Sequence, residues 1–223
     1  MRWKPYYAER YAALSTAIAA EFDELPTFEG IAMQETALPS SKETLAEVGY
    51  TPELYKQNLL RMIIASKKAM KHSQFFWYTN FIPGDSGEIL DQMIERLIPH
   101  EVVVGGPDIL PYRRHLKNLN YPLYEKYKDA VPLFCSAQED SFAHHKNDTR
   151  NNGPNEIRGN KGIPDIHPEG VLTMREIYEF AVKNLHVNYI FWNYYYPDDP
   201  RQRSFDDVYR VVKQNPSFNQ GKR

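Results

Sequence analysis

Apolar positions in this chain fall into short continuous runs separated by longer segments with helical periodicity. The runs predict strands at Gly30–Met33, Gln74–Phe81, Glu101–Gly105, Val131–Ala137 and Asn188–Trp192. The periodic segments predict helices at residues 6–22, 51–70, 86–97, 121–129, 173–185 and 204–213. Because strands and helices alternate along the chain, we expect an α/β protein with a parallel sheet and helices packed outside it.

The first predicted helix, Tyr6–Phe22, is rich in alanine. Leu14, Ala17, Ile18 and Phe22 have the spacing of a single apolar stripe on this helix. We expect that stripe to face the core.

Helix start signals precede several of the other periodic segments. Thr51 stands before Pro52, and Ser86 and Ser204 are placed to cap the helices that follow them. Thr173 and Glu176 have the spacing of a capping box.

Two longer intervals, residues 38–50 and 142–170, show no periodicity and predict loops. The second holds His144, His145, Asp165 and His167, whose spacing matches no strong ligand pattern. We therefore expect a surface loop and no metal site.

Five strands are too few to close an eight-stranded barrel. Three architectures remain open: a doubly wound sheet of the flavodoxin type, a barrel piece whose other strands are missing, or a partial barrel that another chain completes. We favour a partial TIM (β/α) barrel, a single domain over residues 1–223 that lacks its N-terminal strands. Its free sheet edges would favour self-association.

Bulk composition excludes several classes of protein. The 223 residues are 42% apolar with a mean hydropathy of -0.63, and no apolar run approaches the roughly 18 residues of a membrane span. With 27 basic and 29 acidic residues the net charge is -2, so nothing recruits nucleic acid electrostatically. The single cysteine, Cys135, lies inside a predicted strand, where we expect a buried, inert thiol.

Polar or aromatic side chains stand at the carboxyl end of nearly every predicted strand. They are Gln34 and Glu35, Asn80, Asp108, Gln138 with Glu139 and Asp140, and Trp192 with Asn193. Because parallel strands end at the same edge of a sheet, these side chains are expected to share a cleft. Acids and amides can bind hydroxyl groups there, and an indole can stack on the apolar face of a sugar. No phosphate-binding glycine loop occurs, and no cofactor is implied.

Glu35 and Glu139 each follow a glutamine at the end of an apolar strand. Glycoside hydrolysis uses two such carboxyl groups, one to protonate the leaving oxygen and one to attack or to activate water. Asp140 stands beside Glu139, and neighbouring residues of a strand face opposite sides. We favour Glu139 as the nucleophile.

With Glu35 ending a fourth strand and Glu139 a seventh, the chain resembles the C-terminal five strands of a clan A glycoside hydrolase barrel. In that clan the acid/base glutamate ends strand four, the nucleophile ends strand seven, and a tryptophan of strand eight, here Trp192, floors the sugar site. An asparagine usually precedes the acid/base, and this chain has Gln34 there.

The resemblance implies a retaining glycosidase that acts on a carbohydrate. Its sugar-binding side chains would be Gln34, Asn80, Asp108, Gln138 and Trp192. The alternative is a non-catalytic carbohydrate-binding or scaffold protein on the same barrel.

Overall fold

The computed structural model describes residues 2–111, 116–138, 141, 172–193, 204–216 and 218. Five parallel strands form one sheet in the order β1-β2-β3-β4-β5. Strands that neighbour one another in chain order are typical of a (β/α) barrel, whereas a flavodoxin-like sheet has the order 2-1-3-4-5. The expected fold class, α/β with the strand order of a partial barrel and flanking helices, is confirmed.

The described residues divide into two compact units. Unit 1 comprises those of Met1–Gly105 and Asp129–Pro132, and unit 2 those of Gly106–Lys128 and Leu133–Arg223. The boundary falls within β3. Each unit is described by itself below.

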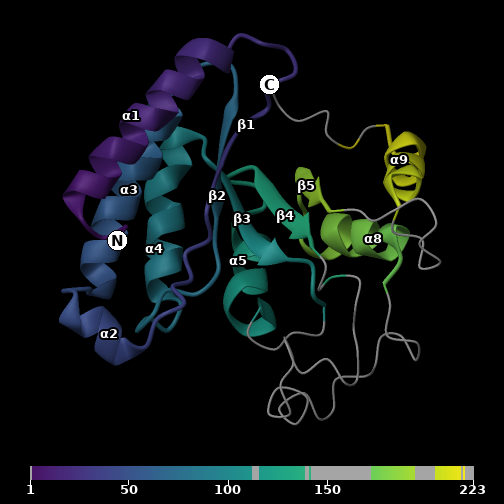
Figure 1. Cartoon of the computed structure of the whole chain (residues 1–223). Coiled ribbons are helices and arrows are strands. Elements are labelled where there is room, and N and C mark those ends of the chain that lie inside the picture. Colours follow the sequence, from purple (N-terminus) through teal and green to yellow (C-terminus); the bar gives the residue numbers. More distant parts are fainter. Residues whose placement is uncertain are drawn as a thin grey trace. The chain divides into compact units, whose positions relative to one another are not determined.

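Unit 1 alternates helices with strands from its first helix onward (Figure 1). In chain order its elements are α1 (Pro5–Phe22), β1 (Gly30–Met33), α2 (Lys42–Glu47), α3 (Pro52–Ala69), β2 (Gln74–Tyr78), α4 (Glu88–Leu97), the 3-10 turn η1 (Ile98–His100) and the first half of β3 (Val103–Asp108).

The core of unit 1 surrounds β2. Phe75, Phe76 and Trp77 are all buried, so this strand is covered on both faces, as in parallel sheets. Figure 1 shows α1, α3 and α4 side by side, and α3 packs against both α1 and α4. The ring of Tyr11 on α1 contacts Phe75 edge-on at 6.4 Å between centroids.

The apolar stripe predicted on α1 does not face the core. Leu14 is 56% exposed and Phe22 is 42% exposed, Ala17 is also exposed, and Ile18 is half-buried. The residues that α1 buries are Ala8, Ser15 and Ala19. These small residues let α1 pack closely against α3, and the hydroxyl of Ser66 on α3 donates to that of Ser15 at 3.0 Å within this contact.

Two further predictions in unit 1 are corrected. The interval 38–50 contains a helix, α2, whose six residues are too few to show periodicity. Ser86 does not cap α4, which begins at Glu88 after Gly87. The carboxylate of Asp85 caps it instead, accepting from the Gly87 and Ile89 N–H groups at 3.0 and 3.2 Å.

The backbones of β1 and β2 approach closely where β1 begins. Gly30 pairs with Gln74, and its φ of 151° lies in a region that side chains disfavour. A Cβ at Gly30 would lie 1.9 Å from the Gln74 carbonyl oxygen. Only glycine fits this contact.

A buried carboxylate ties the end of α1 to the turn before β2. Asp23 accepts hydrogen bonds from the backbone N–H groups of Lys71, His72 and Ser73, at 2.7, 3.1 and 2.9 Å, and from the Ser73 hydroxyl. Burial opposes its ionisation, but the Ser73 hydroxyl and the three N–H donors outweigh burial and lower the pKa of Asp23 to about 2.

Unit 2 begins in the second half of β3 and continues through helices that flank β4 and β5. Its further elements are the π-helical turn η2 (Leu116–Asn120), α5 (Tyr121–Tyr127), β4 (Leu133–Ala137), α8 (Met174–Asn184), β5 (Tyr189–Trp192) and α9 (Phe205–Gln214). Every residue of β4 is buried.

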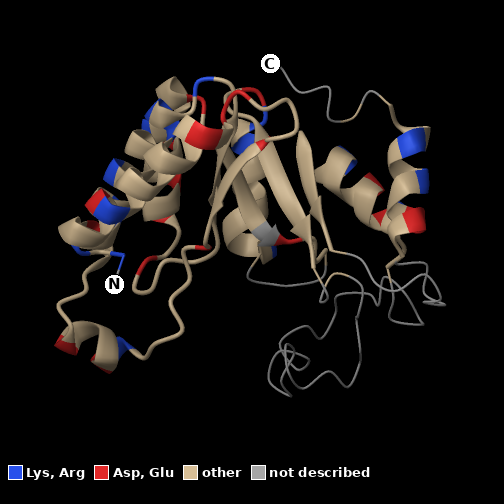
Figure 2. Cartoon of the chain, turned by 45° about the horizontal axis from the view of Figure 1, so that its top comes forward, with Lys and Arg blue, Asp and Glu red and all other residues tan. Residues whose placement is uncertain are grey.

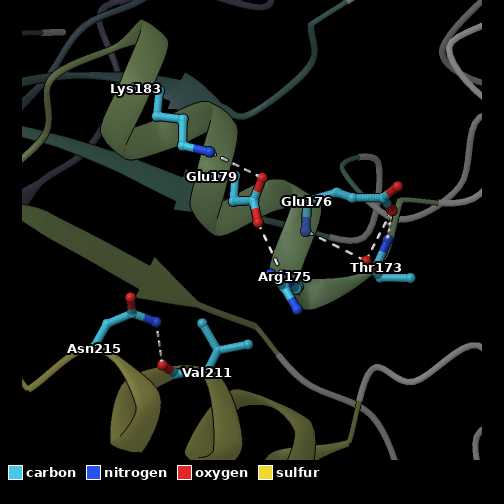
Figure 3. A network of polar contacts seen from close by, with 7 residues as sticks. All are labelled: Thr173, Arg175, Glu176, Glu179, Lys183, Val211 and Asn215. Carbon is cyan, nitrogen blue, oxygen red and sulfur yellow. Dashed lines mark hydrogen bonds and ion pairs between the residues drawn. The ribbon is translucent and has the colours of Figure 1, made fainter.

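The capping box predicted at Thr173 and the cap predicted at Ser204 are both confirmed. Figure 3 shows the first: the Glu176 N–H donates to the Thr173 hydroxyl, and the Glu176 carboxylate accepts from the Thr173 N–H at 2.9 Å. Ser204 and Asp207 form the same arrangement at the start of α9. Figure 3 also shows Glu179 between Arg175 and Lys183 on the exposed side of α8.

A tyrosine hydroxyl lies between β3 and β4. Tyr124 of α5 accepts a hydrogen bond from the Gly106 N–H and donates to the Phe134 carbonyl at 2.7 Å. On either side the strands are bonded directly, Val104 N–H to Pro132 and Ile109 N–H to Ser136. The Tyr124 hydroxyl therefore bridges two backbone groups that would otherwise bond to each other.

Positive and negative side chains are interspersed along the helices of both units (Figure 2). In the described part of the chain, no helix combines the length and the apolar character that a membrane crossing requires.

Candidate functional site

The carboxyl ends of β1 and β2 bring two of the predicted site residues together. Asn80 donates a hydrogen bond from Nδ2 to Oε2 of Glu35, at 2.8 Å. The register explains the meeting, because Met33 pairs with Trp77 and both polar residues follow shortly after that pair. Unit 1 therefore has a carboxylate oriented by an amide where the two strands end.

Thr36 fixes the relative position of these two strand ends. Its buried hydroxyl accepts from the Asn80 N–H at 2.8 Å and donates to the Phe81 carbonyl at 3.1 Å. The backbone on both sides of the Glu35–Asn80 contact is thus held by one side chain.

Arg2 holds the backbone of the loop that follows β1. Its guanidinium donates to the carbonyls of Glu35 and of Ala37, the latter at 2.9 Å, and lies over the Tyr55 ring, 5.6 Å from the centroid. Tyr55 donates from its hydroxyl to the Thr36 carbonyl at 3.0 Å, and burial raises the pKa of Tyr55 above its usual range. The hydroxyl therefore remains a donor at neutral pH.

Arg2, Thr36 and Tyr55 were not among the site residues predicted from the sequence. Arg2 and Glu35 are 33 positions apart in the chain, and no local sequence pattern predicts a contact over that separation. The threonine directly after Glu35 was the one available signal.

Glu35 is half-buried, and its second carboxylate oxygen, Oε1, has no hydrogen-bond partner within the described ranges. Such an oxygen can accept a hydrogen bond from a ligand hydroxyl, or carry a proton to one. Gln34 is exposed.

Asp108, at the end of β3, belongs to unit 2. Its carbonyl accepts from the Tyr121 hydroxyl at 2.9 Å, and the side chain is half-buried. Burial, and then the Asp108 charge, raises the pKa of the Cys135 thiol. Cys135 is buried, as predicted, and the thiolate is disfavoured there.

Gln138 and Trp192 end β4 and β5. Gln138 is exposed, and its backbone exchanges two hydrogen bonds with Ser141, at 3.0 and 3.2 Å. Trp192 pairs with Ala137 and is partly exposed, while its indole nitrogen is buried and has no acceptor in the part of unit 2 that is described. The predicted nucleophile Glu139 and the neighbouring Asp140 lie outside the described residues, as does the histidine-containing interval 142–170.

A concavity of about 390 Å³ lies in unit 2 and contains none of the predicted site residues. It is lined by Pro111, Lys117, Tyr121, Leu172, Glu176, Phe180, Asn184 and Leu185. Most of these residues belong to η2, α5 or α8. The concavity is therefore formed between helices and not at the carboxyl ends of the strands.

Within the described ranges, no group of three or more His, Cys, Asp or Glu side chains is arranged to hold a metal ion. No protein-family model, curated protein sequence or solved structure matches this chain.

Proposed function

We propose that this protein acts on carbohydrates in the manner of a glycoside hydrolase, with Glu35 as the general acid/base. The observation that carries the proposal is the 2.8 Å hydrogen bond from Asn80 to Glu35, made at the carboxyl ends of adjacent parallel strands. Parallel β/α proteins place their chemistry at these ends.

The local geometry supports a role at a reacting bond. One Glu35 oxygen is fixed by Asn80, and the other has no partner among the residues that the structure describes. Thr36 and Arg2 hold the backbone behind it, so the carboxyl group is oriented in advance. A general acid must be positioned in this way to reach the glycosidic oxygen.

In this proposal Glu139 is the nucleophile, and Gln34, Asn80, Asp108, Gln138 and Trp192 hold the sugar. The retaining mechanism requires the carboxyl groups of Glu35 and Glu139 to be about 5 to 5.5 Å apart, and inversion requires a wider separation. A crystal structure with a bound sugar would measure that distance.

The test is hydrolysis of a panel of 4-nitrophenyl glycosides by the whole chain. We expect Glu35→Gln to lower kcat by about 10² to 10⁴-fold, the range that a positioned acid or base contributes. Glu139→Gln should lower kcat at least as far, because an amide cannot replace the carboxylate nucleophile. Glu29→Gln is the matched control. Glu29 is exposed and stands directly before the first residue of β1, at the opposite end of the strand from Glu35. Turnover at the wild-type rate in Glu35→Gln would eliminate the acid/base role.

The second candidate is a non-catalytic carbohydrate-binding protein, since an oriented carboxylate beside an amide also binds sugar hydroxyls. It predicts that oligosaccharides bind in calorimetry, that no glycoside is cleaved, and that Glu35→Gln weakens binding. Cleavage that depends on Glu35 would exclude it.

A further inference from the structure

The side of α1 that faces away from α3 is unusually apolar for an exposed helix surface. Within the described ranges, two of the large exposed hydrophobic side chains, Tyr6 and Leu14, lie on this side of α1, and the alanines Ala13, Ala17 and Ala20 are exposed beside them. Tyr6 is 71% exposed and Leu14 is 56% exposed. Exposed apolar residues gathered on one element indicate a surface that another molecule covers.

One row of this surface carries a charge near each end. Arg10, Leu14, Ala17 and Glu21 are all exposed, and their spacing of four, three and four positions places them along one line of the helix. Neither Arg10 nor Glu21 forms an ion pair within the part of the chain that the structure describes. The two charges are separated by about 16 Å along the helix axis.

We propose that this row, which we call the α1 seam, is where a second copy of the chain binds with its own α1 antiparallel to the first. A two-fold axis between Ser15 and Thr16 would place Arg10 opposite Glu21 of the second copy and Leu14 opposite its Ala17. Both contacts occur twice, as two-fold symmetry requires.

Charge and shape together select this occupant. A parallel second copy would set Arg10 against Arg10 and Glu21 against Glu21, and like charges facing each other are destabilising. The antiparallel copy pairs opposite charges at both ends and fits the large Leu14 side chain against the small Ala17. The exposed alanines Ala13 and Ala20 beside the seam allow two helix backbones to approach closely.

This surface differs from the open sheet edges that the sequence suggested for self-association. The seam consists of side chains on a helix, so its pairing depends on charges that substitution can reverse. Pairing through a sheet edge uses backbone groups and is insensitive to those charges.

The test is analytical ultracentrifugation of the whole chain over a range of concentrations. We expect a reversible monomer–dimer equilibrium, and we expect Arg10→Glu to raise its dissociation constant at least about tenfold because two attractive pairs become repulsive. Glu21→Arg should do the same. Lys42→Glu, the same charge change at an exposed position of α2, should leave the equilibrium unchanged.

Charge exchange provides the decisive arm. Mixing the Arg10→Glu and Glu21→Arg variants should produce a mixed dimer, and the double variant Arg10→Glu/Glu21→Arg should dimerise like the wild type. Leu14→Glu should yield monomers, with circular dichroism confirming that the fold is retained. A monomer at every concentration up to about 0.1 mM, or a dimer that Arg10→Glu and Leu14→Glu leave intact, would overturn the proposal.

Discussion

In unit 1 the backbones of β1 and β2 pair directly and approach so closely at Gly30 that no Cβ fits against Gln74. In unit 2 a hydroxyl from α5 lies between Gly106 of β3 and Phe134 of β4, and bonds to both. The first pair of strands depends on the absence of a side chain, and the second depends on the presence of a specific one.

This difference extends to the strand ends. Where β1 and β2 pair directly, Asn80 and Glu35 come within hydrogen-bond distance of each other. At the end of β3, by contrast, the Asp108 carbonyl is engaged by Tyr121, a neighbour of the bridging Tyr124. The two strand ends are therefore fixed in different ways, one through a contact between side chains and the other through a tyrosine hydroxyl on the backbone.

The strongest test of the direct contact is Gly30→Ala. The new Cβ would meet the Gln74 carbonyl oxygen at 1.9 Å, and the backbone at φ 151° disfavours any side chain, so β1 and β2 must separate. We expect the free energy of unfolding to fall by about 3 to 5 kcal/mol, measured by urea denaturation.

Ala32→Val in the same strand is the matched control. Ala32 is exposed and extended, so the change should stay within about 0.5 kcal/mol. If Gly30→Ala were as stable as Ala32→Val, the close approach of the two strands would be wrong.

The bridging contact is tested by Tyr124→Phe. The buried Gly106 N–H and Phe134 carbonyl would both lose their partner while the ring still separates them. We expect a loss of about 2 to 3 kcal/mol, the cost of leaving buried polar groups unpaired. Hydrogen exchange at the Gly106 amide is the specific measurement, because protection there should fall more than at Val104.

Tyr6→Phe serves as the control, since that hydroxyl is on a 71% exposed side chain. An unchanged exchange rate at Gly106 in Tyr124→Phe would mean that the strands had closed and bonded directly. The two strand pairs would then be alike.

Features set by neighbouring residues were predictable from the sequence. The limits of β1 are those predicted, and Thr51, Thr173 and Ser204 cap their helices as expected, because a cap and the N–H group that donates to it are three positions apart. Asp85 and Ser86 show the limit of such reasoning. Both residue types can cap a helix, and only the backbone geometry selects Asp85.

Features set by distant contacts were not predictable. The side of α1 that faces α3 carries Ala8, Ser15 and Ala19, with Ser15 bonded to Ser66, and the apolar pattern gives such small and polar residues no weight. Arg2 bonds to the carbonyls of Glu35 and Ala37 from more than 30 positions earlier in the chain. At the candidate site, the sequence indicated that Glu35 and Asn80 share one edge, but it carried no information on what fixes them there.

The buried carboxylate of Asp23 joins elements of unit 1 in a third way. Its loss should lower the free energy of unfolding by less than Gly30→Ala or Tyr124→Phe. Its pKa of about 2 lies below the ordinary value of 3.8, so it contributes stability that is complete above about pH 4 and is lost as the pH falls towards 2. At pH 7 this contribution is roughly 2 kcal/mol.

We expect Asp23→Asn to lose about that amount at neutral pH, because the negative charge is gone and an amide nitrogen replaces one of the two oxygens that accept from the Lys71, His72 and Ser73 N–H groups. The variant should also lose less stability than the wild type between pH 4 and pH 2, since the titrating group is gone. Unfolding by urea at a series of pH values measures both effects.

Asp129→Asn, at an exposed position of the same unit, is the charge-matched control and should stay within about 0.5 kcal/mol at neutral pH. If the stability curves of wild type and Asp23→Asn ran parallel through the acid range, the carboxylate would not be ionised against the backbone donors. The end of α1 would then be held by packing alone.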